Sequence, residues 1–251
     1  MNSILYVTTS HLKMYDFSGK RLIESFSDTK QQSKLLYLTE NFKIDNCPPC
    51  VIEQQLDNYP FFTNWLNSNS DIIPTKFGGK DTSLKQGSFN YKASLFFRKI
   101  AALHYAYSNY NMHYDTIIWI DNDCVLKKRF DEHFINFLFN NKDVFYYLGE
   151  KRLKNAGVES GFMGFKHVNG YGFLNKLFTH FEDGSFRKCY RWDDGWVMKE
   201  LVSKSIVCND VANESHKSDV LRECKETYKY LIHKKGSHWR NVIDNCGHRP
   251  S

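Results

Sequence analysis

Short apolar runs, separated by polar turns and amphipathic stretches, mark the first half of the chain. Three of them predict buried strands, at Ser3–Thr9, Lys34–Leu38 and Thr116–Ile120. The third is rich in β-branched and aromatic residues, as in strands covered on both faces. A helix is predicted near Gly19–Phe26, between the first two runs. This strand–helix–strand order predicts an α/β fold with a parallel sheet.

A long helical pattern precedes the third strand. Over Tyr91–Asn109, apolar residues recur at helical spacing on one face, namely Phe96, Ile100, Leu103 and Tyr107. Arg98 and Lys99 interrupt the apolar surface. Cations in such a position usually extend their heads to solvent, but they also reach anionic ligands. Both interpretations stay open.

The second half continues the alternation of helices and strands. Helical patterns cover Arg129–Asn140, Asn169–Phe181 and Val197–Val202, and strand patterns cover Val144–Leu148 and Glu159–Phe165. Asn41–Gly87 carries four prolines and a Gly-Gly pair, so it predicts loops and short helices over one side of the sheet. There is no internal repeat and no low-complexity tract.

Composition adds mild constraints. The chain has 251 residues, of which 41% are hydrophobic, which suits one α/β domain with a mostly parallel central sheet flanked by helices. The net charge is +6, from 34 Lys and Arg against 28 Asp and Glu. That excess favours anionic ligands and is too diffuse to indicate nucleic acid.

The seven cysteines follow no regular spacing, unlike those of a disulfide framework. Cys47-Pro-Pro-Cys50 is the one CxxC pair, half of a zinc site, and reduced cytosolic thiols are the simpler interpretation. Neither a signal peptide nor an apolar run of about 18 residues is visible. We therefore expect a cytoplasmic protein without a transmembrane segment, whose basic side chains could attract it to anionic membrane surfaces.

Two carboxylates follow the third strand, at Asp121 and Asp123, with Asn122 between them. Residues two apart in an extended chain point the same way, so both side chains can face one target. Ligands of open α/β sheets bind at the carboxyl ends of strands, and carboxylate oxygens suit Mg²⁺ or Mn²⁺. The alternative is a solvated turn, for which Asp and Asn are ordinary residues.

Three further groups could carry chemistry. Near the end of the chain, His233 could add an imidazole to a cation, and Gly236 and His238 could approach a diphosphate, although a lone histidine is more often a surface residue. Asp193-Asp194 precedes an apolar helical run, so it is first a helix N-cap. The hydroxyls at Thr8 and Thr9 could bind a base or ribose, or satisfy a turn.

Taken in order, these motifs resemble glycosyltransferases of the GT-A fold. Ile118–Asp123 looks like a strand that ends in their DXD motif, and Val158–Phe165 looks like the strand that follows. Trp192-Asp193-Asp194-Gly195 is similar to the DDQ or DDG segment of the xylosyl/galactosyltransferase-like family 34, with Gly195 where one family has Gln. His233-xx-Gly236-x-His238-Trp239 resembles the closing HxxGxxKPW of the glycogenin-like family 8.

The resemblance implies an enzyme of class EC 2.4 that uses a UDP-sugar donor and Mn²⁺ or Mg²⁺, with retention at the anomeric carbon. It implies one Rossmann-like domain over 1–251, with a nucleotide-binding part at about 1–125 and an acceptor-side part at about 126–251. It assigns Thr8, Thr9 and Tyr15 to the base and ribose; Asp121, Asp123 and His233 to the metal; Gly236 and His238 to the diphosphate; Lys99, Asn122, Ser160 and Gly161 to the rest of the donor; and Asp193 and Asp194 to catalysis.

Other functions stay open. An inverting transferase needs a carboxylate base opposite the leaving group, and Asp194 could be that base. The Asp pairs, the histidines and the positive charge also suit a metal-dependent phosphoesterase or nuclease, which would need carboxylates around two ions. The aromatic content, 16%, would suit a non-catalytic carbohydrate-binding protein. The leading prediction is a transferase whose partners are a nucleotide-sugar and a glycan or glycoconjugate acceptor, and not nucleic acid.

Overall fold

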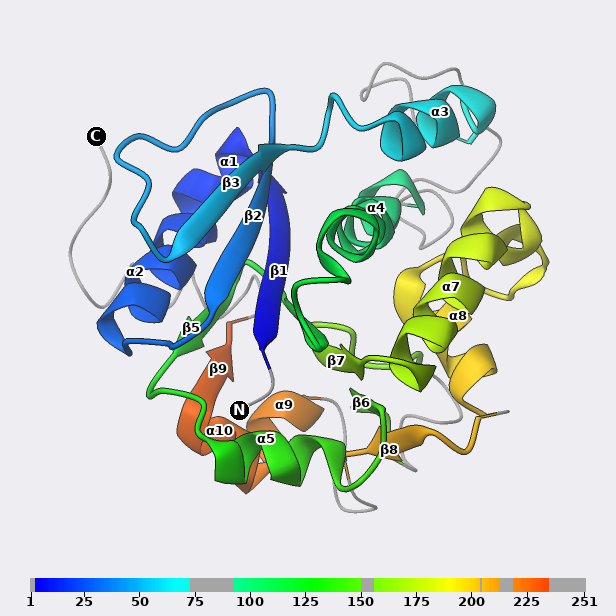
Figure 1. Ribbon diagram of the computed structural model, residues 1–251. Helices are drawn as coiled ribbons and strands as arrows, with labels where there is room; N and C mark the ends of the chain where they lie inside the picture. Colours follow the sequence, from blue (N-terminus) through cyan, green and yellow to red (C-terminus); the bar gives the residue numbers. More distant parts are fainter. Residues whose placement is uncertain (1–2, 73–92, 150–155, 204, 213–218, 235–251) are drawn as a thin grey trace.

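A computed structural model describes residues 3–72, 93–149, 156–203, 205–212 and 219–234. Its centre is a sheet of seven strands in the order β3-β2-β1-β4-β7-β6-β8 (Figure 1). Their bounds are β1 Ile4–His11, β2 Lys34–Glu40, β3 Val51–Gln55, β4 Thr116–Ile120, β6 Val144–Tyr146, β7 Phe162–Lys166 and β8 Cys208–Asp210.

The sheet is mostly parallel. β1 runs parallel to its neighbours β2 and β4, and β3 runs parallel to β2. β7 is antiparallel to both β4 and β6, and β8 is parallel to β6, so β7 alone is reversed. The predicted α/β class, with a mostly parallel sheet flanked by helices, is confirmed.

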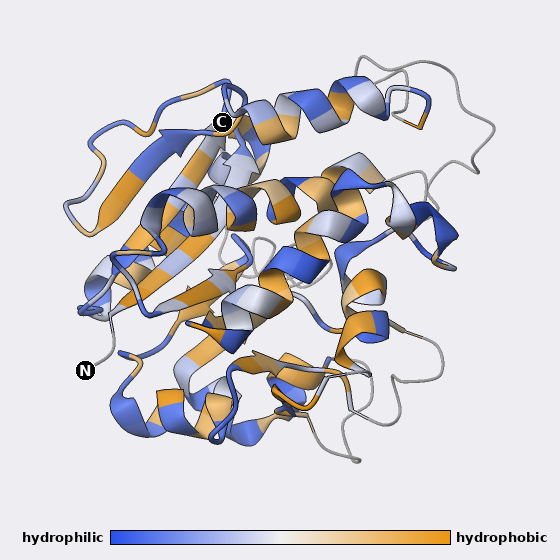
Figure 2. Ribbon diagram, turned by 45° about the vertical axis from the view of Figure 1, so that its right-hand side comes forward, coloured by the Kyte–Doolittle hydropathy of each residue, from blue (hydrophilic) through white to orange (hydrophobic). Residues whose placement is uncertain are grey.

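Helices cover both faces of this sheet. α4, α7 and α8 lie on one face, and α2 and α5 lie on the other (Figure 1). Alternate residues of one strand enter opposite cores, as Ile117 and Ile118 of β4 do. Figure 2 shows the apolar residues concentrated on the central strands and on parts of the covering helices. The helical bounds are α1 Leu12–Met14, a π turn at Tyr15–Gly19, α2 Lys20–Asp28, α3 Pro60–Ser68, α4 Ala93–Tyr110, α5 Glu132–Phe139, α7 Asn169–Glu182, a 3₁₀ turn at Ser185–Lys188, α8 Asp194–Val202, α9 Val220–Glu223 and α10 Lys225–Tyr230.

A second, two-stranded sheet joins the middle of the chain to its tail. β5, Cys124–Leu126, pairs antiparallel with β9, Leu231–His233 (Figure 1). The register sets Cys124 opposite His233. Because β5 begins directly after the acidic pair of the 121–123 turn, this pairing carries the tail histidine to the carboxyl end of β4.

Two local predictions were wrong. Within Asn41–Gly87, residues 51–55 form an edge strand of the main sheet; residues 73–87 lie outside the described part of the chain. β3 carries only two apolar residues and is half-exposed along most of its length, so it lacks a strand pattern. In α4 the predicted core residues Ile100 and Leu103 are fully buried, but Phe96 is half-buried and its neighbour Phe97 is the buried aromatic residue.

Two further observations concern the CxxC pair and the helices. Cys47 and Cys50 are free thiols in the loop that leads to β3. Within the described ranges, no helix combines the length and the apolar character that a membrane span requires.

Candidate functional site

A cavity of about 620 Å³ opens at the carboxyl ends of β1 and β4. In parallel α/β sheets this edge is where ligands bind, because strand ends and their loops converge there. The residues that line it come from six separate stretches of the chain: Thr9, Ser10, His11, Met14, Leu95, Phe96, Arg98, Lys99, Trp119, Asp121, Asn122, Asp123, Glu159, Ser160, Asp194 and His233.

Asp121 is held firmly at the end of β4. Its backbone N–H donates to the Gly161 carbonyl at 2.8 Å, which extends the β4–β7 pairing by one residue. Trp119, two residues earlier on the same side of the strand, donates its indole Nε1–H to Asp121 Oδ1 at 2.6 Å. The carboxylate therefore has one oxygen fixed by the strand that carries it.

A buried lysine bridges the two acidic segments. Lys99 Nζ lies 3.0 Å from Asp121 Oδ1 and 3.0 Å from Asp194 Oδ2. It also donates to the carbonyl and the hydroxyl oxygens of Ser160, at 2.8 and 2.9 Å. Burial opposes the charge of Lys99, but the two carboxylates outweigh it and raise the pKa of the ammonium. Burial likewise opposes ionisation of Asp121, yet Lys99 and His233 hold the pKa of that carboxyl below its ordinary value.

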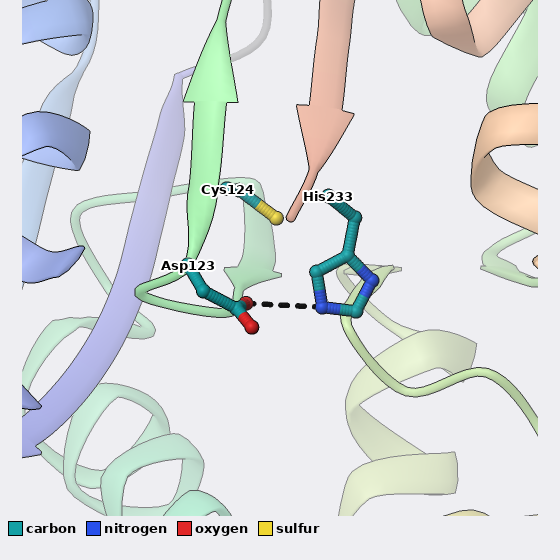
Figure 3. Close-up of side chains that lie close together, drawn as sticks. All are labelled: Asp123, Cys124 and His233. Carbon is teal, nitrogen blue, oxygen red and sulfur yellow. Dashed lines mark ion pairs between the residues drawn. The ribbon is translucent and has the colours of Figure 1, made fainter. Parts of the chain in front are cut away.

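His233 reaches the acidic pair from β9. Its Nε2 lies 3.0 Å from Asp123 Oδ1 (Figure 3). The same atom lies 3.6 Å from Asp121 Oδ2, and Nδ1 lies 3.8 Å from Glu159 Oε1. Burial alone would lower the pKa of the imidazole, but the hydrogen bond and charge of Asp123, with Asp121 and Glu159, raise it to about 9. Three carboxylates around one ring make a strongly negative site that a cation would neutralise.

The donor atoms at this point suit a metal ion. Asp123, Cys124 and His233 each present one ligand atom, and these atoms lie within 4.8 Å of one another (Figure 3). Among the described residues, the buried Nδ1 of His233 makes no hydrogen bond, and the buried Oδ1 of Asp123 faces Nε2 of His233 in the ion pair at 3.0 Å. Buried polar atoms without a hydrogen bond are uncommon, and an ion that they coordinate is one reason for them.

Gly161 leaves the room that the imidazole occupies. A Cβ at this position would lie 2.6 Å from Cε1 of His233 and within 3.1 Å of both ring nitrogens. Because no real Cβ tolerates that contact, the residue must be glycine for the ring to lie where it does. The imidazole of His233 lies against Gly161, and contact of Gly161 with the donor stays a prediction.

The residues predicted to hold the nucleotide divide into two groups. Thr9 and Asn122 line the cavity and lie together, since Asn122 Nδ2 donates to the Thr9 carbonyl at 3.4 Å. Thr8 is fully buried, and Tyr15 packs its ring against Tyr37 and Phe42. Neither Thr8 nor Tyr15 lines the cavity. Their contact with a ligand stays a prediction.

The predicted catalytic pair is also divided. Asp193 is the N-cap of α8: its Oδ1 accepts from the Trp196 backbone N–H at 3.1 Å, and its Oδ2 accepts from Arg191 Nε at 2.8 Å. Asp194 lines the cavity and is 1% exposed. Ser160 lines it too. Gly236 and His238 lie outside the described residues.

Sequence reasoning missed several residues of the cavity wall. The alternation along β4 could have identified Trp119, which faces the same side as Asp121. Glu159 directly precedes Ser160-Gly161, but nothing in its neighbours singles it out. Arg98, identified from the sequence as a cation that could reach an anionic ligand, lines the cavity and donates through Nε to both carboxylate oxygens of Glu40, at 2.8 and 2.9 Å; the sequence missed this partner. Arg98 is on a helix and Glu40 is at a strand end far away in the sequence, so no local sequence pattern indicates that they pair.

Comparisons with known proteins bear on the fold. No protein-family model matches the chain, and no curated protein matches it. Among solved structures, it is similar to a glycosyltransferase involved in the glycosylation of the major capsid of PBCV-1. The TM-score is 0.55 at 10% identity, and the match covers 98% of each chain. At that identity the likeness shows a shared α/β fold.

Proposed function

We propose that this chain is a glycosyltransferase that moves a hexose or pentose from a nucleotide-sugar, preferably a UDP-sugar, to a glycan or glycoconjugate acceptor. One observation carries the proposal. The tail imidazole of His233 lies 3.0 Å from Asp123, beside Asp121, in a cavity at the carboxyl edge of the sheet. The likeness in fold to a glycosyltransferase supports the same conclusion.

Asp121, Asp123 and His233 would hold a divalent cation, Mn²⁺ or Mg²⁺. When bound, such an ion neutralises the negative charge that grows on a departing diphosphate. The ligand set fits this use, because three protein ligands leave coordination positions for phosphate oxygens. Thr9 and Asn122, on the neighbouring wall, would contact the nucleoside.

Lys99 and Asp194 would set the geometry on the sugar side. The ion pairs of Lys99 with both acidic residues, at 3.0 Å each, fix the Asp194 carboxylate at the cavity wall. A carboxylate paired with a buried ammonium is a poor proton acceptor, because protonation would leave the lysine charge unpaired. That pairing favours the retaining route, in which the acceptor hydroxyl gives its proton to the departing phosphate oxygen.

A phosphoesterase or nuclease is the second candidate. Its usual chemistry places two cations about 4 Å apart between carboxylates. In the described ranges, one group of three metal-ligating side chains is present, at Asp123, Cys124 and His233. A single group supports one ion, and therefore favours the transferase.

The test is hydrolysis of UDP-sugars in the absence of an acceptor, with and without Mn²⁺. We expect release of UDP that depends on Mn²⁺ and falls by at least 100-fold in Asp123→Asn, on the order of what loss of one electrostatic group costs an active site. The matched control is Asp28→Asn, the same change at an exposed position at the end of α2, which should retain full activity.

Two results would contradict the proposal. Activity that is indifferent to Mn²⁺, or equal in the Asp123→Asn and Asp28→Asn variants, would remove the cation from the reaction. Cleavage of phosphate esters or nucleic acid without any binding of UDP-sugars would favour the phosphoesterase. Glycan binding that is indifferent to both UDP and metal would favour a carbohydrate-binding protein.

A further inference from the structure

Cys124 lies at the metal-ligating group but has no part in the proposed reaction. It is the first residue of β5, directly after Asp123, and it is 0% exposed. The β5–β9 register sets it opposite His233. Side chains opposite each other in an antiparallel pair project from the same face, with Cβ atoms about 5 Å apart. The thiol and the imidazole are therefore held together by two paired backbones.

The thiol points into the same space as its two neighbours. The Sγ atom lies within 4.8 Å of the ligand atoms of Asp123 and His233 (Figure 3). Within the described part of the chain, it donates a weak hydrogen bond to the carbonyl of Gly161, at 3.9 Å. Meanwhile Nδ1 of His233 is buried and makes no hydrogen bond among the described residues, and Oδ1 of Asp123 is buried against Nε2 of His233 at 3.0 Å. A carboxylate oxygen, a thiol sulfur and an imidazole nitrogen, which differ in their preference for hard and soft cations, are thus close enough to bind one ion.

The chemistry of these donors separates two kinds of cation. Oxygen ligands suit hard ions such as Mg²⁺ and Mn²⁺, whereas a thiolate selects Zn²⁺, Cd²⁺ or Co²⁺. One sulfur, one nitrogen and one carboxylate oxygen are three ligands of a tetrahedral site, and Asp121, with Oδ2 at 3.6 Å from His233 Nε2, can supply a fourth. A site with four protein ligands is closed, as structural zinc sites are.

We propose that Asp123, Cys124 and His233 form a binding site for a thiophilic divalent cation such as Zn²⁺ or Cd²⁺. Binding exchanges the S–H bond of Cys124 for a sulfur–metal bond, and the coordinating nitrogen of His233 gives up its proton; both protons pass to water, and no electron is transferred. The bound ion excludes the hard cation and fills the positions that phosphate oxygens would take. This inhibitory effect rests on the proposed function, whereas the binding itself does not.

The test uses Co²⁺ as a spectroscopic probe of the metal-free full-length protein. A cobalt–thiolate bond gives a near-ultraviolet charge-transfer band, and tetrahedral ligands give strong visible bands. We expect both in the wild type, and we expect Cys124→Ser to lose the charge-transfer band. Affinity for Cd²⁺ should fall at least about tenfold in Cys124→Ser, while affinity for Mn²⁺ changes less than about threefold.

The matched control is Cys208→Ser, the same change at a half-buried thiol of β8, which should keep the band. Circular dichroism of each variant establishes that it is folded. A band that persists in Cys124→Ser, or a wild type that binds Co²⁺ without the band, would overturn the proposal. Because these readouts need no sugar donor, they stand apart from the activity assay: inactivity towards UDP-sugars with the band present would refute only the transferase.

Discussion

The contact between Gly161 and His233 sets the position of the tail histidine. The imidazole ring is 4% exposed and lies against the backbone of Gly161, with Asp121, Asp123 and Glu159 around it. Buried carboxylates cost free energy unless their charges are compensated, so the stability of this cluster depends on the distance between the ring and the carboxylates. The backbone at residue 161 is not in the left-handed region, so glycine is required for space and not for conformation.

Gly161→Ala should therefore damage the site through a steric contact. A methyl group 2.6 Å from Cε1 of His233 must displace the ring or the strand. We expect a loss of roughly 1–3 kcal/mol in the free energy of unfolding, as for other overpacked cores. Affinity for Mn²⁺ should fall by about tenfold or more, since the ring is predicted to be a ligand. Urea titration and calorimetric metal titration measure the two effects.

Gly172→Ala is the control for that variant. Gly172 lies within α7, and a Cβ there meets nothing within 4 Å. Because alanine is the better helix former, this variant should be as stable as the wild type or more stable by about 0.5–1 kcal/mol. Equal behaviour of the two variants would mean that the ring moves freely and that Gly161 has no part in positioning it.

At the scale of elements, the start of α8 separates two neighbouring carboxylates. Asp193 serves the helix: it caps the first turn and pairs with Arg191. Burial and the charge of Asp194, only partly offset by Arg191, raise the pKa of Asp193. Asp194 is the first residue of the helix and points to Lys99 at 3.0 Å. At the start of α8, two adjacent aspartates therefore point to different partners: Asp193 to the helix backbone and Arg191, and Asp194 to Lys99.

Paired substitutions should separate these tasks. Asparagine caps helices as well as aspartate does, so Asp193→Asn should retain most of the transferase activity and most of the stability. Asp193→Ala should lose about 1 kcal/mol in the free energy of unfolding while keeping its activity per folded molecule. Asp194→Asn should lose at least about 100-fold in kcat, because Lys99 then loses one of its two carboxylate partners and the negative charge at this point of the cavity wall is removed. Activity lost equally in Asp193→Asn and Asp194→Asn would show that both carboxylates act on the substrate.

At the scale of the whole molecule, the sequence predicts elements that have a local pattern, and it does not predict pairings between short segments that are far apart along the chain. The strands β1, β2 and β4 are covered by helices on both faces, so each is a continuous apolar run that the sequence reveals. β5 and β9 have three residues each, and they pair across more than a hundred residues of chain, so no local pattern predicts them. The resemblance of the motifs to a known family predicted that Asp121, Asp123 and His233 would lie together. It did not predict that Cys124 would pair with His233.

The same non-local packing holds α4 against α3 and α7 through one histidine. The ring of His104 stacks on Phe61, with centroids 3.8 Å apart, and meets Phe178 edge-on. Its Nδ1 shares a hydrogen bond with Tyr59 Oη at 2.5 Å. Burial in this aromatic setting lowers the pKa of His104 from 6.5 to about 4. The folded protein therefore keeps this imidazole neutral at a pH where the unfolded chain protonates it.

The sign of the resulting pH dependence is fixed by that difference. Between pH 6.5 and about 4 the unfolded state binds more protons at His104, so this group's contribution to stability falls as the pH falls through that window. Each pKa unit corresponds to about 1.4 kcal/mol, and partial exposure of the ring reduces the effect to on the order of 1–2 kcal/mol.

His104→Gln, which retains a hydrogen-bonding group but cannot titrate, should flatten this part of the profile when urea midpoints are compared at pH 7 and pH 5. His113→Gln, at an exposed histidine, should leave the profile unchanged, and an equally steep profile in His104→Gln would show that other groups carry the acid sensitivity.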